Sequence, residues 1–300
     1  MNDIVNEIPL KDILEDINNL INKIEELGLE KKIKNTKVYK WLSSLGNEFN
    51  KNYEDDIKRL IKLNKYRRVL NFIIENSSNI KPTTIKEIIS GSELILDDSD
   101  KSENYLFEID IADRILKIMG RGNKLVDLNS NTDIIFDNEI FVECKKIHRE
   151  NSFKDNLKKA NKQIQNAKLN LDQKAFIALE LTDVFNKNDV IELSNKISEY
   201  FRVKYKELEN SENYIHDRNF RKIVQSLFNS KLEFLFQNMI KEFYRKNKGF
   251  KFDDHIIGIF YQYDTYFRTP TSDLIAIRGA TFYPLKEKAR DFFMSLVTGI

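Results

Sequence analysis

Apolar side chains recur every three or four positions through most of the first hundred residues. In "LKDILEDINNLINKIEEL" (10–27) the leucines and isoleucines fall on one face of a helix. The same spacing continues in three further segments: "TKVYKWLSSLGNEF" (36–49), "YEDDIKRLIKLNKYRRVLNFIIE" (53–75) and "KPTTIKEIISG" (81–91). The pattern predicts an all-α bundle over residues 1–100, and the turn-rich residues 90–103 predict a boundary at its end.

Beyond this boundary, short β-rich runs alternate with helical segments. The spacing predicts helices over 103–120 and 152–171, the second of which starts with a capping box at Ser152 and Asp155. Strands are predicted at 124–128, 132–136, 140–145 and 174–181. The remaining predicted elements are helices at 188–206 and 213–247, strands at 255–263 and 273–279, and a helix from about Leu285. This order predicts an α/β domain over 101–300, with an antiparallel meander that leads into a crossover helix.

The stretch "TDIIFDNEIFVECKKIH" (132–148) has a carboxylate at the start of one apolar run and another at the end of the next. A two-residue turn at 137–138 would place Asp133 across from residue 142, one position before Glu143. The two carboxylates would then lie at the same open end of a hairpin.

Side chains near the end of this hairpin alternate between the two faces of the strand. Glu143 and Lys145 share one face because the side-chain period is two, whereas Cys144 points the other way as a small core residue. The facing of Asp133 depends on the register, and Asp127 is the alternative carboxylate if the register differs.

Two carboxylates that converge within a few ångströms repel each other unless a proton or a cation lies between them. Mg²⁺ suits such a pair because it prefers oxygen ligands and is completed by water and phosphate. A neighbouring lysine can orient a water molecule or neutralise charge that develops on a phosphate. These groups together are the parts needed for phosphodiester hydrolysis.

The helix before the hairpin contributes a third candidate, Glu108. Steps of three and four residues from Tyr105 to Met119 place Glu108 on a stripe that is otherwise apolar or small. The opposite side, predicted to be solvated, carries Asp110, Asp113, Arg114 and Lys117. A charge on a core-facing stripe needs a partner or a metal. The alternative is that Glu108 reaches solvent near the helix N-terminus, where carboxylates are favoured.

Composition narrows the class of protein. The chain is 41% hydrophobic and 32% charged, which is typical of a globular protein with a sizeable core. One cysteine and three histidines exclude a disulfide framework, a cysteine zinc cluster and an imidazole metal site. With no signal sequence and no apolar run of ~20 residues, the chain is expected to be cytoplasmic and without a membrane partner.

The net charge of +2 conceals two basic segments. Residues 31–80 hold twelve basic and five acidic side chains, a net charge of +7. Residues 145–174 hold nine basic and three acidic side chains, a net charge of +6. Such segments could form a footprint for a polyanion, or they could be the solvated faces of lysine-rich helices.

Three quoted segments resemble the PD-(D/E)XK nuclease superfamily, which has the restriction-endonuclease-like fold: "FEIDIADRILKIMG" (107–120), "NTDIIFDNEIFVECKK" (131–146) and "LKKANKQI" (157–164). Thr132 stands where the family usually has a proline. The resemblance covers residues 103–181. It implies an α/β core with a mixed central sheet flanked by helices, and a nuclease dependent on Mg²⁺ or Mn²⁺ that cleaves DNA or RNA, in genome defence or repair.

The resemblance also implies roles for individual residues. The implied metal ligands are Asp133, Glu143 and the backbone carbonyl of Cys144, with Glu108 holding a second metal ion or a metal-bound water. Lys145 would position the attacking water, Gln163 would face the site, and His148 would contact a phosphate or be structural. The implied phosphate-backbone contacts are Lys146, Arg149, Lys158 and Lys162.

Two readings of function remain open at this point. One is the nuclease, favoured because a protein that only binds has no physical need to keep repelling acids together. The other is a catalytically inactive nuclease-like protein that binds nucleic acid or a protein partner. The basic helices of 1–100 either grip nucleic acid or form a bundle for a homo-oligomer or another partner, with Trp41 in its core.

Overall fold

The computed structural model describes ten stretches of the chain: residues 10–26, 33–48, 54–76, 82–92, 101–119, 126–128, 132–184, 187–204, 218–268 and 274–298. None of their helices is both long enough and apolar enough to cross a membrane.

Helices form an N-terminal layer, as the spacing of apolar residues predicts. They are α1 (Leu10–Glu26), α2 (Lys37–Glu48), α3 (Glu54–Glu75) and α4 (Pro82–Ile89), with a 3₁₀ turn at Ile33–Asn35. Their apolar stripes face one another, and Trp41 is 3% exposed, which confirms its place in the core. In the sequence these helices precede a mixed α/β unit.

A six-stranded sheet, ordered β1 to β6, forms the centre of that unit. Its strands are β1 (Val126–Asp127), β2 (Ile134–Phe136), β3 (Ile140–Lys146), β4 (Lys174–Glu180), β5 (Ile256–Arg268) and β6 (Leu274–Pro284). The pairs β3–β4 and β4–β5 are parallel and the other pairs are antiparallel, which confirms the predicted α/β class with a mixed sheet.

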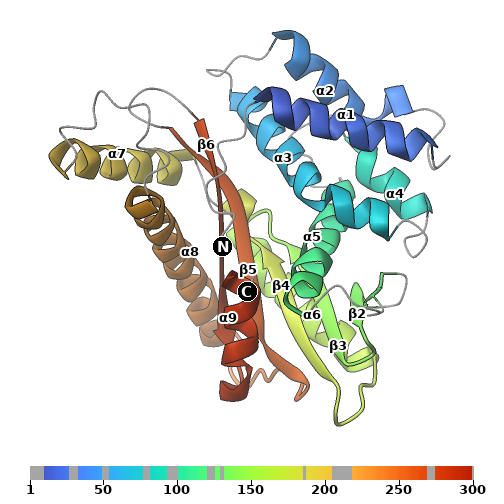
Figure 1. Ribbon diagram of the computed structural model, residues 1–300. Helices are drawn as coiled ribbons and strands as arrows, with labels where there is room; N and C mark the ends of the chain where they lie inside the picture. The colour runs from blue at the N-terminus through green and yellow to red at the C-terminus, as the bar shows by residue number, and fades with distance from the viewer. Residues whose placement is uncertain are drawn as a thin grey trace.

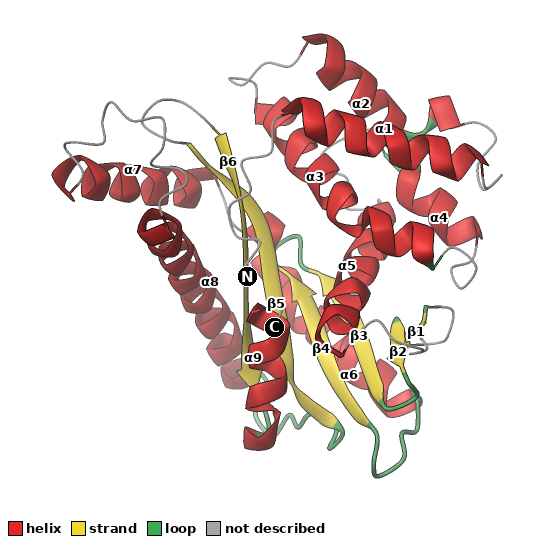
Figure 2. Cartoon of the chain, viewed as in Figure 1, coloured by secondary structure: helices red, strands yellow, loops and turns green. Residues whose placement is uncertain are grey.

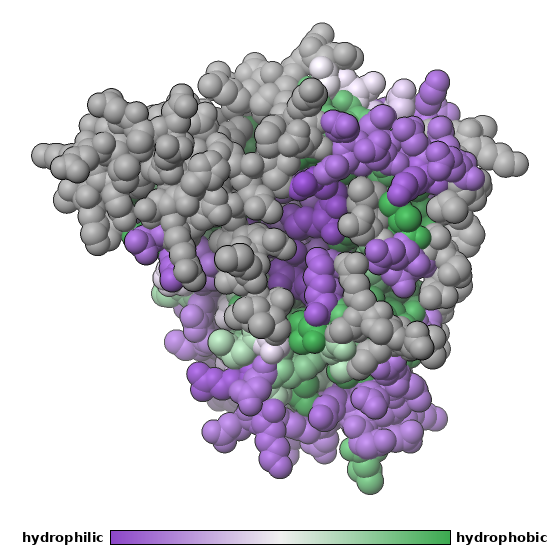
Figure 3. All heavy atoms as spheres, viewed as in Figure 1, coloured by the Kyte–Doolittle hydropathy of each residue, from purple (hydrophilic) through white to green (hydrophobic). Residues whose placement is uncertain are grey.

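Helices cover both faces of the sheet (Figures 1 and 2). They are α5 (Ser102–Met119), α6 (Glu150–Asn166), α7 (Lys187–Lys204), α8 (Arg218–Lys246) and α9 (Arg290–Thr298). One buried cluster joins α5, α9 and the N-terminal layer to one face, and a second joins α6, α7 and α8 to the other. The N-terminal layer therefore shares a continuous apolar core with α5. On the face shown in Figure 3, hydrophilic residues gather over part of this layer and at the lower end of the molecule.

Two boundary predictions for α6 were wrong. The helix begins at Glu150 with Arg149 as its N-cap and no side-chain cap, so Ser152 does not form a capping box; its hydroxyl donates to the Arg149 carbonyl. The helix ends at Asn166, and Leu171 lies in a fully exposed turn. The apolar spacing therefore extended the helix by about one turn too many, because a single exposed leucine can fit a helical pattern by chance.

The predicted solvated face of α5 was wrong for three of its four residues, and only Lys117 is exposed as predicted. Asp110 is 1% exposed and Asp113 is 4% exposed, and Arg114 is half-buried with its guanidinium donating to the Leu296 carbonyl at 3.2 Å. Gln262 donates to the Asp110 carboxylate at 2.7 Å, and Arg278 pairs with the same carboxylate. Strands β5 and β6 and helix α9 supply these partners. The polar pattern of α5 alone could not show whether its charged side chains face solvent or buried partners from other elements.

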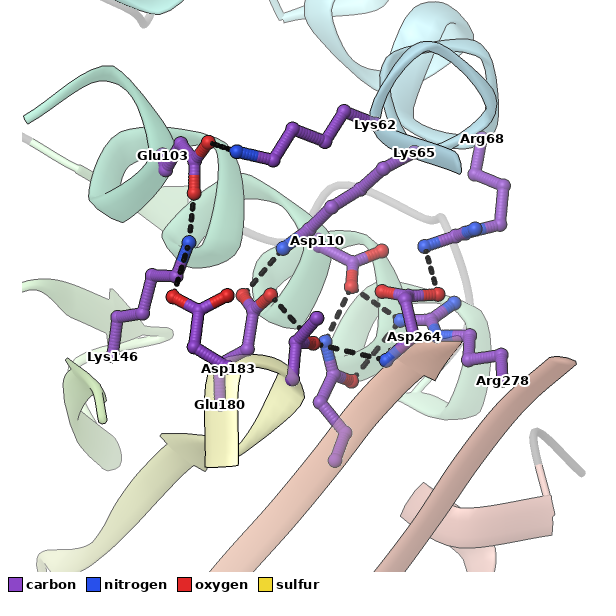
Figure 4. Close-up of polar contacts among 12 residues, drawn as sticks. Lys62, Lys65, Arg68, Glu103, Asp110, Lys146, Glu180, Asp183, Asp264 and Arg278 are labelled. Atoms are coloured by element: carbon purple, nitrogen blue, oxygen red, sulfur yellow. Dashed lines mark hydrogen bonds and ion pairs between the residues drawn. The ribbon is translucent and has the colours of Figure 1, made fainter. Parts of the chain in front are cut away.

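Charged side chains link α3 to the sheet and to α5 (Figure 4). This interlayer network consists of Lys62, Lys65, Arg68, Glu103, Asp110, Lys146, Glu180, Asp183, Asp264 and Arg278. Lys62, Lys65 and Arg68 pair with Glu103, Glu180 and Asp264, respectively. These three cations of α3, predicted either to grip nucleic acid or to be solvated, are instead internal.

We expect Lys65→Met to destabilise the protein by about 3 kcal/mol. The change leaves Glu180 buried without its cation, and breaking a buried ion pair costs about 3–5 kcal/mol. Urea unfolding of both proteins measures the difference. The matched control is Lys196→Met, which removes an exposed pair with Glu192 and should leave the midpoint unchanged. Equal midpoints for Lys65→Met and wild type would contradict a stabilising role for the network.

Candidate active site

The hairpin of β2 and β3 differs from the predicted one by one residue. Asp137 and Asn138 both have positive φ (47° and 56°), residue types that tolerate this conformation, and the Glu139 amide donates to the Phe136 carbonyl at 2.9 Å. Phe136 pairs with Ile140 rather than with residue 139. The extra residue in the turn shifts the register by one position.

This shift settles the facing of Asp133. Ile134 pairs with Val142, so the next position along the hairpin sets Asp133 opposite Glu143, on the same face. The Cys144 amide donates to Asp133 Oδ2 at 2.7 Å. The two acids are therefore close together, as predicted. They lie directly across from each other, which the simple two-residue turn did not predict.

Lys145 lies between the two carboxylates. Its Nζ is 3.2 Å from Asp133 Oδ2, 3.0 Å from Glu143 Oε2 and 2.9 Å from the Cys144 carbonyl oxygen. Burial lowers the pKa of Lys145, but the charges of Asp133 and Glu143 outweigh it and raise the pKa above its ordinary value. In the metal-free protein Lys145 is therefore a cation, and its Nζ donates hydrogen bonds to these three oxygens.

Glu108 and Glu143 are carboxyl groups whose pKa values are raised at this site. Burial raises the pKa of Glu108 to about 9, and Asp133 adds to the rise against the opposing charge of Lys145. Burial and Asp133 raise the pKa of Glu143 to about 7, again against Lys145. Three carboxyl groups thus share one ammonium ion, a perturbation typical of functional sites.

A groove of about 570 Å³ opens beside this cluster. Its lining comes from α5 (Asn104, Glu108), the hairpin and its end (Asp133, Cys144, Lys145, Lys146, His148, Arg149) and α6 (Ser152, Asn156, Lys159, Gln163). The α6 residues recur at steps of four, three and four, so they form one face of that helix. The predicted Gln163 lies on this groove face, and its Oε1 is buried without a hydrogen-bond partner among the described residues.

The structure does not bring every predicted phosphate contact to the groove. Arg149 is exposed on its lining, but Lys158 and Lys162 are absent from it, and Lys159 takes their place. Lys146 reaches the groove only at its back, because its 3% exposed side chain pairs with Glu103 and Asp183. The missed Lys159 could have been found by stepping back four residues along the helix from Gln163.

The oxygen atoms at the site fit a divalent cation of the Mg²⁺ type. Glu143 is fully buried, and its Oε1 has no hydrogen-bond partner among the described residues. Asp133 and the Cys144 carbonyl supply further oxygens beside it. Within the described stretches, no group of three or more His, Cys, Asp and Glu side chains is arranged to hold a metal on its own. A cation here would therefore need water and substrate oxygens as well, as Mg²⁺ commonly does.

His148 lines the groove and pairs with Asp183, which does not line it, and the sequence did not predict this pair. Asp183 follows β4, and its Oδ2 is 2.7 Å from His148 Nδ1. Burial would raise the pKa of Asp183, but the hydrogen bond to His148 and the charge of Lys146 hold it well below its ordinary value. The signal available in the sequence was the position of Asp183 just after a buried strand, where ligand sites of α/β sheets gather.

No known family model, curated protein or solved structure matches this chain.

We expect Glu108→Gln to stabilise the metal-free protein at pH 8 by about 2 kcal/mol. A carboxyl whose folded pKa is raised contributes stability that is full below its unfolded pKa of about 4.5 and is lost as pH rises toward about 9. The amide has no charge to bury, so the gain should vanish below about pH 4.5. Thermal or urea unfolding across pH 4–9 measures this difference.

The matched control for this prediction is Glu139→Gln. Glu139 is exposed at the turn of the same hairpin, so its replacement should leave the pH profile of stability unchanged. Loss of stability in Glu108→Gln at pH 8 would instead mean that Glu108 is ionised and paired in the folded protein.

Proposed function

We propose that this chain is a metal-dependent nuclease with a restriction-endonuclease-like core. The observation that carries the proposal is the convergence of Asp133, Glu143 and Lys145 at one end of a hairpin, beside a groove that Glu108 also lines. Buried carboxyl groups that lie close together and have raised pKa values favour the binding of a cation between them. The polar groove beside them favours the binding of an anionic polymer.

Asp133, Glu143 and the Cys144 carbonyl would hold Mg²⁺ or Mn²⁺, which supplies a Lewis acid for the phosphoryl group and acidifies a bound water. Lys145, a cation at neutral pH, would orient that water and neutralise charge developing on the phosphate. Glu108, on α5, would accept a hydrogen bond from the water. Glu108, Asp133, Cys144 and Lys145 line the groove, whereas Glu143 is fully buried and contacts it only through Lys145.

The groove face of α6 would hold the phosphate backbone next to the cleaved bond. Ser152, Asn156 and Gln163 supply uncharged hydrogen-bonding groups, and Lys159 supplies a cation. Contacts of this kind give affinity and orientation without reading bases. Nucleic acid is therefore the partner we propose, with the groove face of α6 as the surface that holds it.

Wild type should cleave DNA or RNA oligonucleotides only when Mg²⁺ or Mn²⁺ is added. Asp133→Ala and Lys145→Ala should each lower the cleavage rate by at least about a hundredfold, because a ligand or a positioned donor is lost. Initial rates on labelled single-stranded and duplex substrates measure the effect. The matched control is Asp127→Ala, since Asp127 is exposed on the neighbouring β1 and does not line the groove. Metal-dependent cleavage that survives both substitutions would overturn the site.

Salt dependence should separate charged from uncharged contacts along α6. In a Lys145→Ala background that does not cleave, we expect Lys159→Gln to reduce the slope of log affinity against log salt by about 0.9, the loss of one phosphate contact on duplex DNA. Asn156→Ala should weaken binding without changing the slope, since no ion is released. Fluorescence anisotropy at salt concentrations between about 50 and 200 mM measures the affinity and its salt slope for each variant.

Lys158→Gln and Lys162→Gln are the controls for this measurement. Both lysines lie on α6 beside Lys159 and neither lines the groove, so the slope should not change. A reduced slope for these two variants and not for Lys159→Gln would mean that the phosphate backbone binds the face of α6 with Lys158 and Lys162, as the sequence predicted.

A further inference from the structure

Two polar side chains on the groove face of α6 have donor groups that are engaged by nearby backbone carbonyls. The Ser152 hydroxyl donates its single hydrogen to the Arg149 carbonyl at 2.8 Å. Asn156 Nδ2 donates to the Ser152 carbonyl at 2.9 Å. These bonds leave Ser152 Oγ and Asn156 Oδ1 as hydrogen-bond acceptors beside the groove that both side chains line.

Gln163 adds a third acceptor further along the same face of the helix. Its Oε1 is buried, and no described residue donates a hydrogen bond to this atom, although the side chain lines the groove. A buried acceptor without a donor costs free energy, so such an atom calls for a partner. From Ser152 to Gln163 the helix rises by about 16 Å, which is long enough for several nucleotides.

The groove suits the backbone of a nucleic acid strand better than its bases. Among the described residues that line it there is no Phe, Tyr or Trp, so it lacks the large aromatic rings on which unpaired bases stack. Lys159, exposed on the same face, is a partner for a phosphate oxygen. Phosphate oxygens accept hydrogen bonds and carry no hydrogen to donate, so they cannot pair with the three acceptors of α6.

A ribose 2′-hydroxyl is the donor that the backbone of a nucleic acid can supply. Each nucleotide of RNA carries this group, which both donates and accepts, whereas the deoxyribose of DNA has no hydroxyl at that position. DNA in the groove would leave the buried oxygen of Gln163 without a donor. A site whose buried polar groups stay unpaired with one ligand discriminates strongly against that ligand.

We propose that the substrate of this site is RNA, and that Ser152, Asn156 and Gln163 accept hydrogen bonds from its 2′-hydroxyl groups. The inference deepens the proposed nuclease function and rests on it. Lys159 gives affinity for either polymer through a phosphate, whereas the three oxygen atoms distinguish ribose from deoxyribose. Base sequence is not read by these contacts, because they are made to the sugar and not to the base edges.

Three oligonucleotides of one sequence test the proposal with the unmodified protein. They are RNA, the matched DNA with thymine for uracil, and RNA in which fluorine replaces each 2′-hydroxyl. Fluorine keeps the sugar pucker of RNA but has no hydrogen to donate, so this strand separates the donor from the shape of the backbone. We expect kcat/KM with Mg²⁺ to be at least about thirtyfold higher for RNA than for the other two, since each net hydrogen bond contributes a factor of about five.

The variant Gln163→Met examines the buried acceptor directly, because the change removes Oε1 and keeps the length of the side chain. We expect the RNA-to-DNA ratio of kcat/KM to fall about fivefold. The matched control is Gln165→Met, an exposed glutamine of the same helix that does not line the groove, and it should keep the wild-type ratio. Because the ratio compares two substrates on one protein, a general loss of folding or activity cancels from it.

Each contrary result would overturn a different part of the proposal. Cleavage of DNA as fast as RNA would overturn the choice of substrate and leave the nuclease intact. Cleavage of the 2′-fluoro strand as fast as RNA would mean that the shape of the strand is recognised, and would overturn the 2′-hydroxyl contacts. An unchanged ratio in Gln163→Met would overturn the contact at Gln163. Absence of metal-dependent cleavage of all three strands would overturn the proposed function and the inference together.

Discussion

Pairing of buried charges is the constraint on which the arrangement of layers depends. Glu180 at the end of β4, Asp264 in β5 and Glu103 at the start of α5 are carboxylates withdrawn from water, and α3 carries a cation for each. Removing one partner would leave an uncompensated buried charge, which is far more costly than the pair is stabilising. The N-terminal helices therefore belong to the same packed unit as the sheet, joined to it by apolar contacts and by these ion pairs.

At the candidate site the buried carboxyl groups outnumber the cations that could pair with them. Glu108, Asp133 and Glu143 share Lys145, and burial together with the charge of Asp133 raises the pKa values of Glu108 and Glu143. Elsewhere in the described core, carboxylates such as Asp110 and Asp183 have more than enough cationic partners and their pKa values fall. Because cationic side chains are too few at this one point of the interior, the site favours the binding of a cation from solution.

Prediction from the sequence succeeded where a feature depends on neighbours in the chain. The hairpin that joins Asp133 to Glu143, the shared face of Glu143 and Lys145 and the amphipathic α6 all follow from local periodicity. It failed where the outcome depended on distant partners. The polar side of α5 met β5 and β6, and the basic side of α3 met the ends of the strands, so both became buried.

The order of residues alone determined the class of each long element, the gathering of acids at one hairpin end and the direction of Cys144 toward the core, because these depend on turns and on periods of two and 3.6. Only the tertiary structure decided the register that sets Asp133 opposite Glu143, the choice of Lys159 over Lys158 and Lys162, and the pairing of His148 with Asp183. These features depend on one extra residue in the hairpin turn, on the rotation of a helix against the sheet and on contacts between segments far apart in the chain.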